Sequence, residues 1–170
     1  MNSRLTEGFF LRDVLQVAPE MLGKTIARRF DNGLAERYTV TEVEVYRGVE
    51  DLACHASKGR TPRTEVMFQK GGQVYVYLIY GIYWMLNIVT GPENDASAIL
   101  IRGVRGISGP GKVGKALKLD KSFYGENLQS SKRIWIEDAP PVKKYSTTKR
   151  IGINYAGEFW SCKLWRFIVS

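Results

Sequence analysis

Apolar and polar residues alternate along much of the chain, and this period of two is typical of β-strands. Strands are expected at residues 24–30, 35–46, 74–80, 83–90, 98–104, 133–137 and 164–169. Asp31-Asn32-Gly33 marks a reversal after the first strand, and Gly81 marks another after the third. Short helices are expected at 9–15, 19–22 and 112–119, and residues 56–72 are expected to form a polar loop with one helical turn.

These elements predict an α+β fold. Hairpins outnumber crossover helices, so we expect a mixed, largely antiparallel β-sheet with a protruding β-hairpin and flanking helices. The chain has 170 residues, which is enough for one hydrophobic core and short for two. A single domain over residues 1–170 is therefore expected. The hydrophobic fraction of 44% argues against a disordered chain.

The charge balance narrows the class of partner. Lys and Arg number 25 against 17 Asp and Glu, and the resulting charge of +8 suits a nucleic acid or an acidic membrane surface. The longest apolar stretch, 74–89, is too short and too polar to span a membrane, and the first residues do not resemble a signal peptide. Cys54 and Cys162 are too few for a disulfide framework. We expect an intracellular protein, cytoplasmic in a prokaryote or nuclear in a eukaryote.

Candidate chemistry gathers at residues 42–55. Glu42, Glu44 and Tyr46 share one face of the strand expected there, and the only histidine, His55, follows in the next loop. Two carboxylates and a phenol make a poor hydrophobic core. A carboxylate beside an aromatic ring and an imidazole suits a base-binding pocket with a general base, for which Glu44 is the candidate. The alternative for Glu44 is a surface ion pair, and Glu42 is equally well placed for either role.

A single histidine limits the other chemistries. A zinc site around His55 would need mostly carboxylate ligands, which is unusual, and no nucleophile-elbow motif supports a Ser-His-Asp triad. A structural role for His55 stays open. Asn87 lies among apolar neighbours in an expected strand, so it needs a hydrogen-bond partner or a ligand.

The run 75–84 is rich in tyrosine. Tyr80 comes directly before Gly81, where a side chain is well placed to project outward. In a basic protein such an aromatic residue could enter a DNA groove or stack on bases. The alternative is a core hairpin whose hydroxyl groups find partners within the protein.

Residues 109–116 match the phosphate-binding P-loop motif up to its last position. A P-loop needs a Ser or Thr hydroxyl at that position to hold Mg²⁺, and Ala116 has none. A dinucleotide site would need a parallel βαβ unit, which the hairpins do not offer. Nucleotide hydrolysis is therefore not expected, whereas phosphate binding and a simple tight turn both stay open.

Taken together, these segments resemble the alkyladenine (3-methyladenine) DNA glycosylase family, whose members are monofunctional purine-excising enzymes. The resemblance covers nearly the whole chain. It rests on an ordered set of segments, namely 11–24, 42–48, 50–55, 60–63, 67–68, 75–83, Asn87, Arg102, 109–112, 150–152 and 155–158. The ordered set is far more specific than any single motif.

The resemblance implies a role for each candidate residue. Glu44 matches the glutamate that activates the attacking water, and Arg102 matches an arginine that helps to hold the water and the flipped nucleotide. The walls that sandwich the flipped base match Tyr46, His55 and Tyr77. Asn87 matches a pocket-floor residue that disfavours the amino group of guanine. Tyr80 matches the residue that enters the minor groove and fills the vacated place in the DNA stack.

The implied function is hydrolysis of the N-glycosidic bond of alkylated or deaminated purines, such as 3-methyladenine, 7-methylguanine and hypoxanthine. The nucleotide is flipped first, and an abasic site is left for base excision repair. The implied partner is double-stranded DNA containing damaged purines, bound by a monomer without cofactor or metal. The electron-rich walls are expected to prefer cationic bases. The alternative is a module that binds damaged DNA or structured RNA without cleaving it, and a carboxylate at Glu44 argues against that alternative.

Overall fold

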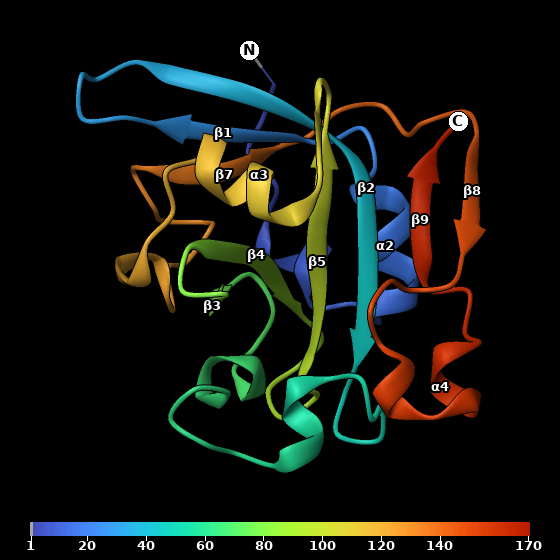
Figure 1. Cartoon of the computed structure of the whole chain (residues 1–170). Helices are drawn as coiled ribbons and strands as arrows, with labels where there is room; N and C mark the ends of the chain where they lie inside the picture. The colour runs from blue at the N-terminus through green and yellow to red at the C-terminus, as the bar shows by residue number, and fades with distance from the viewer. Residues whose placement is uncertain (1) are drawn as a thin grey trace.

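The computed structural model describes residues 2–170 and consists mainly of β-strands (Figure 1). The strands are β1 (Thr25–Arg29), β2 (Ala35–Arg47), β3 (Val74–Ile79), β4 (Tyr83–Thr90), β5 (Ser97–Val104), β6 (Ile107–Ser108), β7 (Ile134–Glu137), β8 (Tyr145–Thr148) and β9 (Arg166–Val169). The α-helices are α1 (Glu7–Phe10), α2 (Val14–Met21), α3 (Pro110–Ala116) and α4 (Glu158–Ser161). The 3₁₀ turns are η1 (His55–Lys58), η2 (Glu65–Phe68), η3 (Lys121–Phe123) and η4 (Asn154–Ala156). None of the helices within 2–170 is long and apolar enough to cross a membrane.

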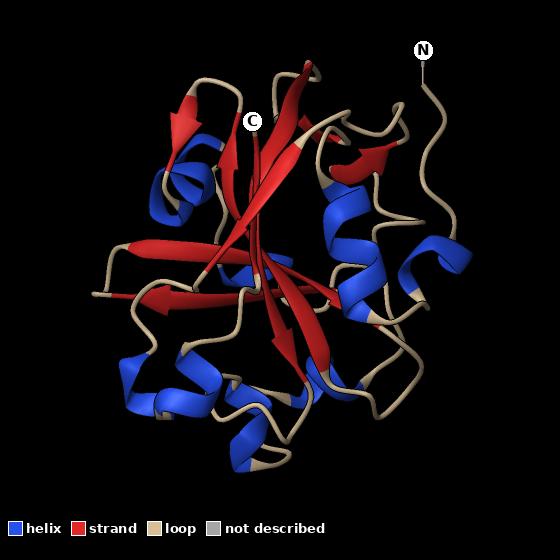
Figure 2. Ribbon diagram, turned by 90° about the vertical axis from the view of Figure 1, so that its right-hand side faces the viewer, coloured by secondary structure: helices blue, strands red, loops and turns tan. Residues whose placement is uncertain are grey.

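The strands pair in the order β3-β4-β5-β2-β1-β7, with β9 also on β2 and β8 beyond β9. Every pair of named strands in the described chain is antiparallel. β2 and β5 run side by side through the middle of the molecule, and the side view of Figure 2 shows helices on both sides of the strands. The predicted α+β class with a largely antiparallel sheet is confirmed.

β2 changes partners along its length. Its first half pairs with β1, and its second half pairs with β5 and β9. Between the two halves the register shifts at Val40–Val43, which is the effect of a β-bulge. Because of the extra residue, Val40, Val43 and Val45 can all point into the core. The bulge therefore positions Glu44 on the opposite face, between β5 and β9.

The two faces of the sheet serve different purposes. On one face, Ile99 and Ile101 of β5 pack in the main hydrophobic core, which also contains the buried face of α2. Alternate residues of the same strands point the other way. The residues of β3, β4 and β5 on this second face line a cavity, and they are Tyr75, Tyr77, Ile79, Met85, Asn87, Ala98, Leu100 and Arg102.

Several predicted element bounds are wrong. The helices expected at 9–15 and 19–22 are instead α1 and α2, and α2 contains Pro19 in its interior. The Asp13 side chain accepts a hydrogen bond from the Leu15 N–H and begins α2, whose buried face stabilises it despite the proline. α3 begins at Pro110 because proline suits the first helical turn.

Elements with weak sequence signals were missed. The mostly exposed strand β8 carries no apolar alternation, so its pairing with β9 could not be predicted. The 56–72 loop also holds two 3₁₀ turns where one helical turn was expected.

Candidate active site

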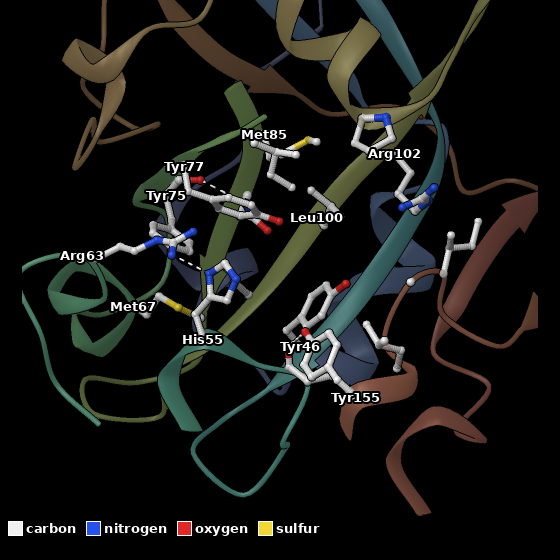
Figure 3. Close-up of a pocket in the computed structure, with 18 of the residues that line it drawn as sticks. Tyr46, His55, Arg63, Met67, Tyr75, Tyr77, Met85, Leu100, Arg102 and Tyr155 are labelled. Carbon is white, nitrogen blue, oxygen red and sulfur yellow. Dashed lines mark hydrogen bonds between the residues drawn. The ribbon is translucent and has the colours of Figure 1, made fainter. Parts of the chain in front are cut away.

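A cavity of about 320 Å³ opens on the face of the sheet opposite the main core (Figure 3). Its volume lies at the lower end of the range for small-molecule sites. Six of the seven predicted site residues line it, namely Tyr46, His55, Tyr77, Tyr80, Asn87 and Arg102. The seventh, Glu44, is fully buried directly behind the wall that Tyr46, Arg102 and Ile151 form.

Three donors surround the Glu44 carboxylate. The Tyr46 hydroxyl donates to Oε1 at 2.9 Å, and the backbone N–H of Ile151 donates to Oε2 at 2.7 Å. Arg102 Nη1 lies 3.5 Å from Oε1, which makes it the longest of the three contacts. Each donor is itself part of the cavity wall. The carboxylate is thus held by groups that a bound molecule would touch.

Burial is the main influence on the pKa of the Glu44 carboxyl. Removal from water raises the pKa of its carboxyl above the ordinary value, against the smaller opposing effects of Arg102 and the two hydrogen bonds. A carboxylate with a raised pKa is a stronger proton acceptor than a solvated one. The surface ion pair considered above for Glu44 is therefore wrong.

Glu42 differs from Glu44 in its surroundings, although the two share one face of β2. Its Oε1 accepts a hydrogen bond from Arg102 at 3.1 Å and another from Arg166 at 2.9 Å. Two arginines thus neutralise Glu42, and Arg102 bridges both carboxylates. Glu42 does not line the cavity.

The aromatic residues stand on two sides of the cavity, with His55 and Tyr77 facing Tyr46 across it (Figure 3). The ring centres of His55 and Tyr77 are 4.6 Å apart with an edge-to-face arrangement. His55 Nδ1 lies 2.8 Å from the Tyr75 hydroxyl. Burial, helped by the charges of Arg63 and Lys58, lowers the pKa of His55 to about 4, so the imidazole is neutral at pH 7.

Asn87 lies in β4 on the same face as the tyrosines and is 3% exposed. Its side-chain N–H donates to the Tyr75 carbonyl at 3.2 Å, and this contact fixes the orientation of the amide. The expected hydrogen-bond partner is thus a backbone group, and part of the amide still faces the cavity.

Tyr80 lies at the tip of the β3–β4 hairpin and is 87% exposed. Its φ of 54° and that of Gly81, 68°, are both left-handed, and the Ile82 N–H closes the turn on the Ile79 carbonyl. A tyrosine in this conformation is uncommon and strained. The turn thus presents a large aromatic ring to solvent at the edge of the cavity, so a core role for Tyr80 is excluded.

A buried ion pair that the sequence did not suggest supports the part of the site formed by Tyr46 and Ile151. Arg150 and Asp51 form two short contacts, 2.6 Å and 3.0 Å, and both side chains are fully buried. The Arg150 guanidinium also lies 5.1 Å from the Tyr46 ring centre and donates to the Val45 carbonyl. Because Ile151 follows Arg150, the pair holds the N–H that contacts Glu44.

Other cavity residues were also missed. The 150–152 and 155–158 segments carried the family resemblance, but backbone contacts such as that of Ile151 leave no mark in a sequence. The wall residues without a predicted role include Arg63, Tyr75 and Tyr155. Across 2–170, no cluster of three or more His, Cys, Asp or Glu could hold a metal ion. The thiol of Cys54 is buried, which raises its pKa to about 12 and removes it as a nucleophile.

Comparison with known proteins gives a consistent result. The sequence profile of the methylpurine-DNA glycosylase (MPG) family matches residues 8–108 and 105–170. A protein of Legionella pneumophila (strain Corby), provisionally named a 3-methyladenine DNA glycosylase, is 41% identical over 176 residues, 98% of this chain and 94% of the relative. A protein of Methanocella arvoryzae with the same provisional name is 39% identical over 183 residues, 96% of this chain and 90% of the relative.

Proposed function

The chain belongs to the methylpurine-DNA glycosylase family and is thus a DNA glycosylase, a hydrolase of DNA repair. We propose that it excises alkylated or deaminated purines, among them 3-methyladenine, 7-methylguanine and hypoxanthine, from double-stranded DNA. The bond broken is the N-glycosidic bond, and the product is an abasic site. The observation that carries this proposal is the fully buried Glu44 carboxylate behind an aromatic cavity.

Glu44 is the general base of the proposed reaction. We assign the attacking water to the cavity side of the Glu44–Arg102 pair, because at 3.5 Å this is the loosest of the three contacts of the carboxylate and leaves Oε1 free to accept from a further partner there. As the C1′–N bond breaks, positive charge develops on the sugar, and the carboxylate stabilises it. The water oxygen then bonds to C1′, one of its protons passes to Glu44, and the bond electrons leave with the purine.

The cavity receives the flipped base. Tyr46 on one side and His55 with Tyr77 on the other form the walls that hold a purine. Because the His55 and Tyr77 rings are inclined at 71°, only one of them can stack flat on the base, and such stacking is worth ~1–3 kcal/mol per base. Flipping costs a few kcal/mol. Tyr80 offsets part of this cost by filling the vacated place in the stack. Asn87 contacts the edge of the base at the floor of the cavity and disfavours the amino group of guanine.

The proposed enzyme is monofunctional and acts as a monomer. A lyase would need an amine nucleophile, and among residues 2–170 that line the cavity none is a lysine. All the groups in the mechanism come from one chain, and the reaction uses only water as a co-reactant. The net charge of +8 favours association with the phosphate backbone of the DNA. A module that only binds DNA would gain nothing from burying Glu44 beside a polyanion.

Incubation with duplexes that carry one 7-methylguanine or one hypoxanthine tests this proposal. The expected products are the free base and a full-length strand, which breaks at the lesion only after treatment with alkali. Release of neither base from a folded protein that binds the duplexes would disprove the proposed excision. Strand breakage without alkali would show a lyase activity instead.

A further inference from the structure

Two arginines line the cavity, and only one of them is ion-paired within the described residues 2–170. Arg102 is ion-paired with Glu42 and Glu44. Arg63, in the loop that leads to η2, has no carboxylate within 4.0 Å in the described residues 2–170. Its neighbour Arg60, by contrast, pairs with Glu65 at 3.2 Å. The unneutralised charge of the cavity wall is therefore that of Arg63.

The Arg63 charge lies against the aromatic wall. Its guanidinium carbon is 5.3 Å from the centre of the Tyr77 ring. In the view of Figure 3 the side chain approaches His55 and Tyr77 from the side away from Tyr46. The same charge contributes to the lowered pKa of His55 and acts on the phenol of Tyr77. A purine stacked between Tyr77 and Tyr46 would thus have this cation behind one of its walls.

A cation behind the wall changes which base the cavity prefers. An electron-rich ring attracts a positively charged purine through its negative face. The Tyr77 ring already attracts the Arg63 guanidinium in this way. The Arg63 charge also repels a second cation on the other side of the ring. Arg63 is exposed to solvent, so water partly screens its charge. Two unit charges about 10 Å apart shift a binding equilibrium by about twofold at the dielectric constant of water and by roughly tenfold at an effective value of about 20.

We infer that Arg63 is a specificity residue that disfavours cationic purine lesions, such as 7-methylguanine, and so favours neutral lesions, such as hypoxanthine. The inference rests on the proposed function because it concerns the base that enters the same cavity. It opposes the expectation from the aromatic rings alone, which favours the cationic lesions.

The test compares wild type with Arg63→Gln, Arg63→Lys and Arg60→Gln on two duplexes, one with hypoxanthine and one with 7-methylguanine. The quantity measured is the second-order rate constant of base release, and the result is the ratio of the two lesions for each protein. Cationic bases leave more easily by themselves, so only the change in this ratio between variants is informative. Arg60→Gln removes one positive charge from the same loop and controls for weaker attraction of DNA.

Arg63→Gln is expected to shift the ratio about two- to tenfold toward 7-methylguanine, the size of the charge effect above. Arg63→Lys keeps the charge and is expected to stay close to wild type, and Arg60→Gln is expected to slow both lesions equally. An unchanged ratio in Arg63→Gln, with both bases still released, would overturn the inference and leave the proposed function intact. Release of neither base by wild type would instead contradict the proposed function.

Discussion

Burial shifts the pKa values of Glu44 and His55, two titratable residues of the site, in opposite directions. Glu44 loses its water and its pKa rises, whereas His55 loses its water and its pKa falls. The charge of Arg102 and two hydrogen bonds keep the pKa of Glu44 from rising further. The result is a more basic carboxyl group beside an imidazole that is uncharged at neutral pH. His55 is therefore suited to stacking on a base and not to proton transfer.

His55 is the only histidine, so its titration can be followed by NMR without ambiguity. We predict a pKa of about 4 in the folded protein, against about 6.5 for a free histidine. Because the unfolded chain binds this proton more readily, the contribution of His55 to stability is full above pH 6.5 and is lost as the pH falls toward 4. A measured pKa near 6.5 would contradict the burial of this ring.

The segment that begins at Arg150 depends on one buried ion pair. Asp51 also accepts hydrogen bonds from the N–H groups of Arg47 and Ala53, so it ties the loop after β2 to the segment that contacts Glu44. Removing one partner of such a pair leaves a buried charge unpaired. The fixed position of the Ile151 N–H therefore has its origin in Asp51.

We predict that Asp51→Asn lowers the free energy of unfolding by about 3–5 kcal/mol, measured by urea denaturation. Base release per folded molecule should fall as well, because the Ile151 N–H and the Tyr46 ring lose their support. Glu20→Gln is the matched control, since it breaks the exposed Arg12–Glu20 pair, whose loss should change stability by about 1 kcal/mol or less. Equal effects of the two substitutions would rule out the proposed support.

The β3–β4 hairpin stores local strain at its tip. Tyr80 adopts a left-handed conformation that suits glycine or asparagine far better. Its ring is exposed and contributes little to the core. Strain at an exposed aromatic residue beside a cavity is typical of functional positions.

We predict that Tyr80→Ala leaves the free energy of unfolding within about 0.5 kcal/mol of wild type. Base release from duplex DNA should fall about tenfold or more, which corresponds to one lost stacking contact of ~1–3 kcal/mol. Tyr145→Ala, at a half-exposed tyrosine of β8, serves as the control and should keep full activity. Unchanged release by Tyr80→Ala would exclude the role of Tyr80 as a plug.

At the scale of the whole molecule, one sheet separates a hydrophobic core from a reactive face. The alternation of Val43, Glu44 and Val45 predicted this separation, because the period of two follows from the backbone alone. The exposed hairpin tip followed from Gly81. The family resemblance then identified the residues that line the cavity, because the segments that carry it follow one another in a fixed order.

The remaining features depend on contacts between distant residues. Glu42 differs from Glu44 in its surroundings because it pairs with Arg166, which is 124 positions away from Glu42 in the chain. The contact of Glu44 with Ile151 uses a backbone N–H, which any residue type supplies. The unpaired charge of Arg63 is visible only once the neighbours of its loop are known. Long-range pairing and burial decide these points, and a single sequence encodes neither directly.

The most direct test of the account is single-turnover release of hypoxanthine or 7-methylguanine by wild type, Glu44→Gln and Glu42→Gln. Lesion binding is measured in parallel. We predict that Glu44→Gln loses about 10²–10⁴-fold in rate while it still binds the lesion, the range for removal of a general base. Glu42→Gln should lose far less, because Arg102 keeps Glu44 as a partner. Release by Glu44→Gln at the wild-type rate would contradict the central claim that Glu44 activates the water.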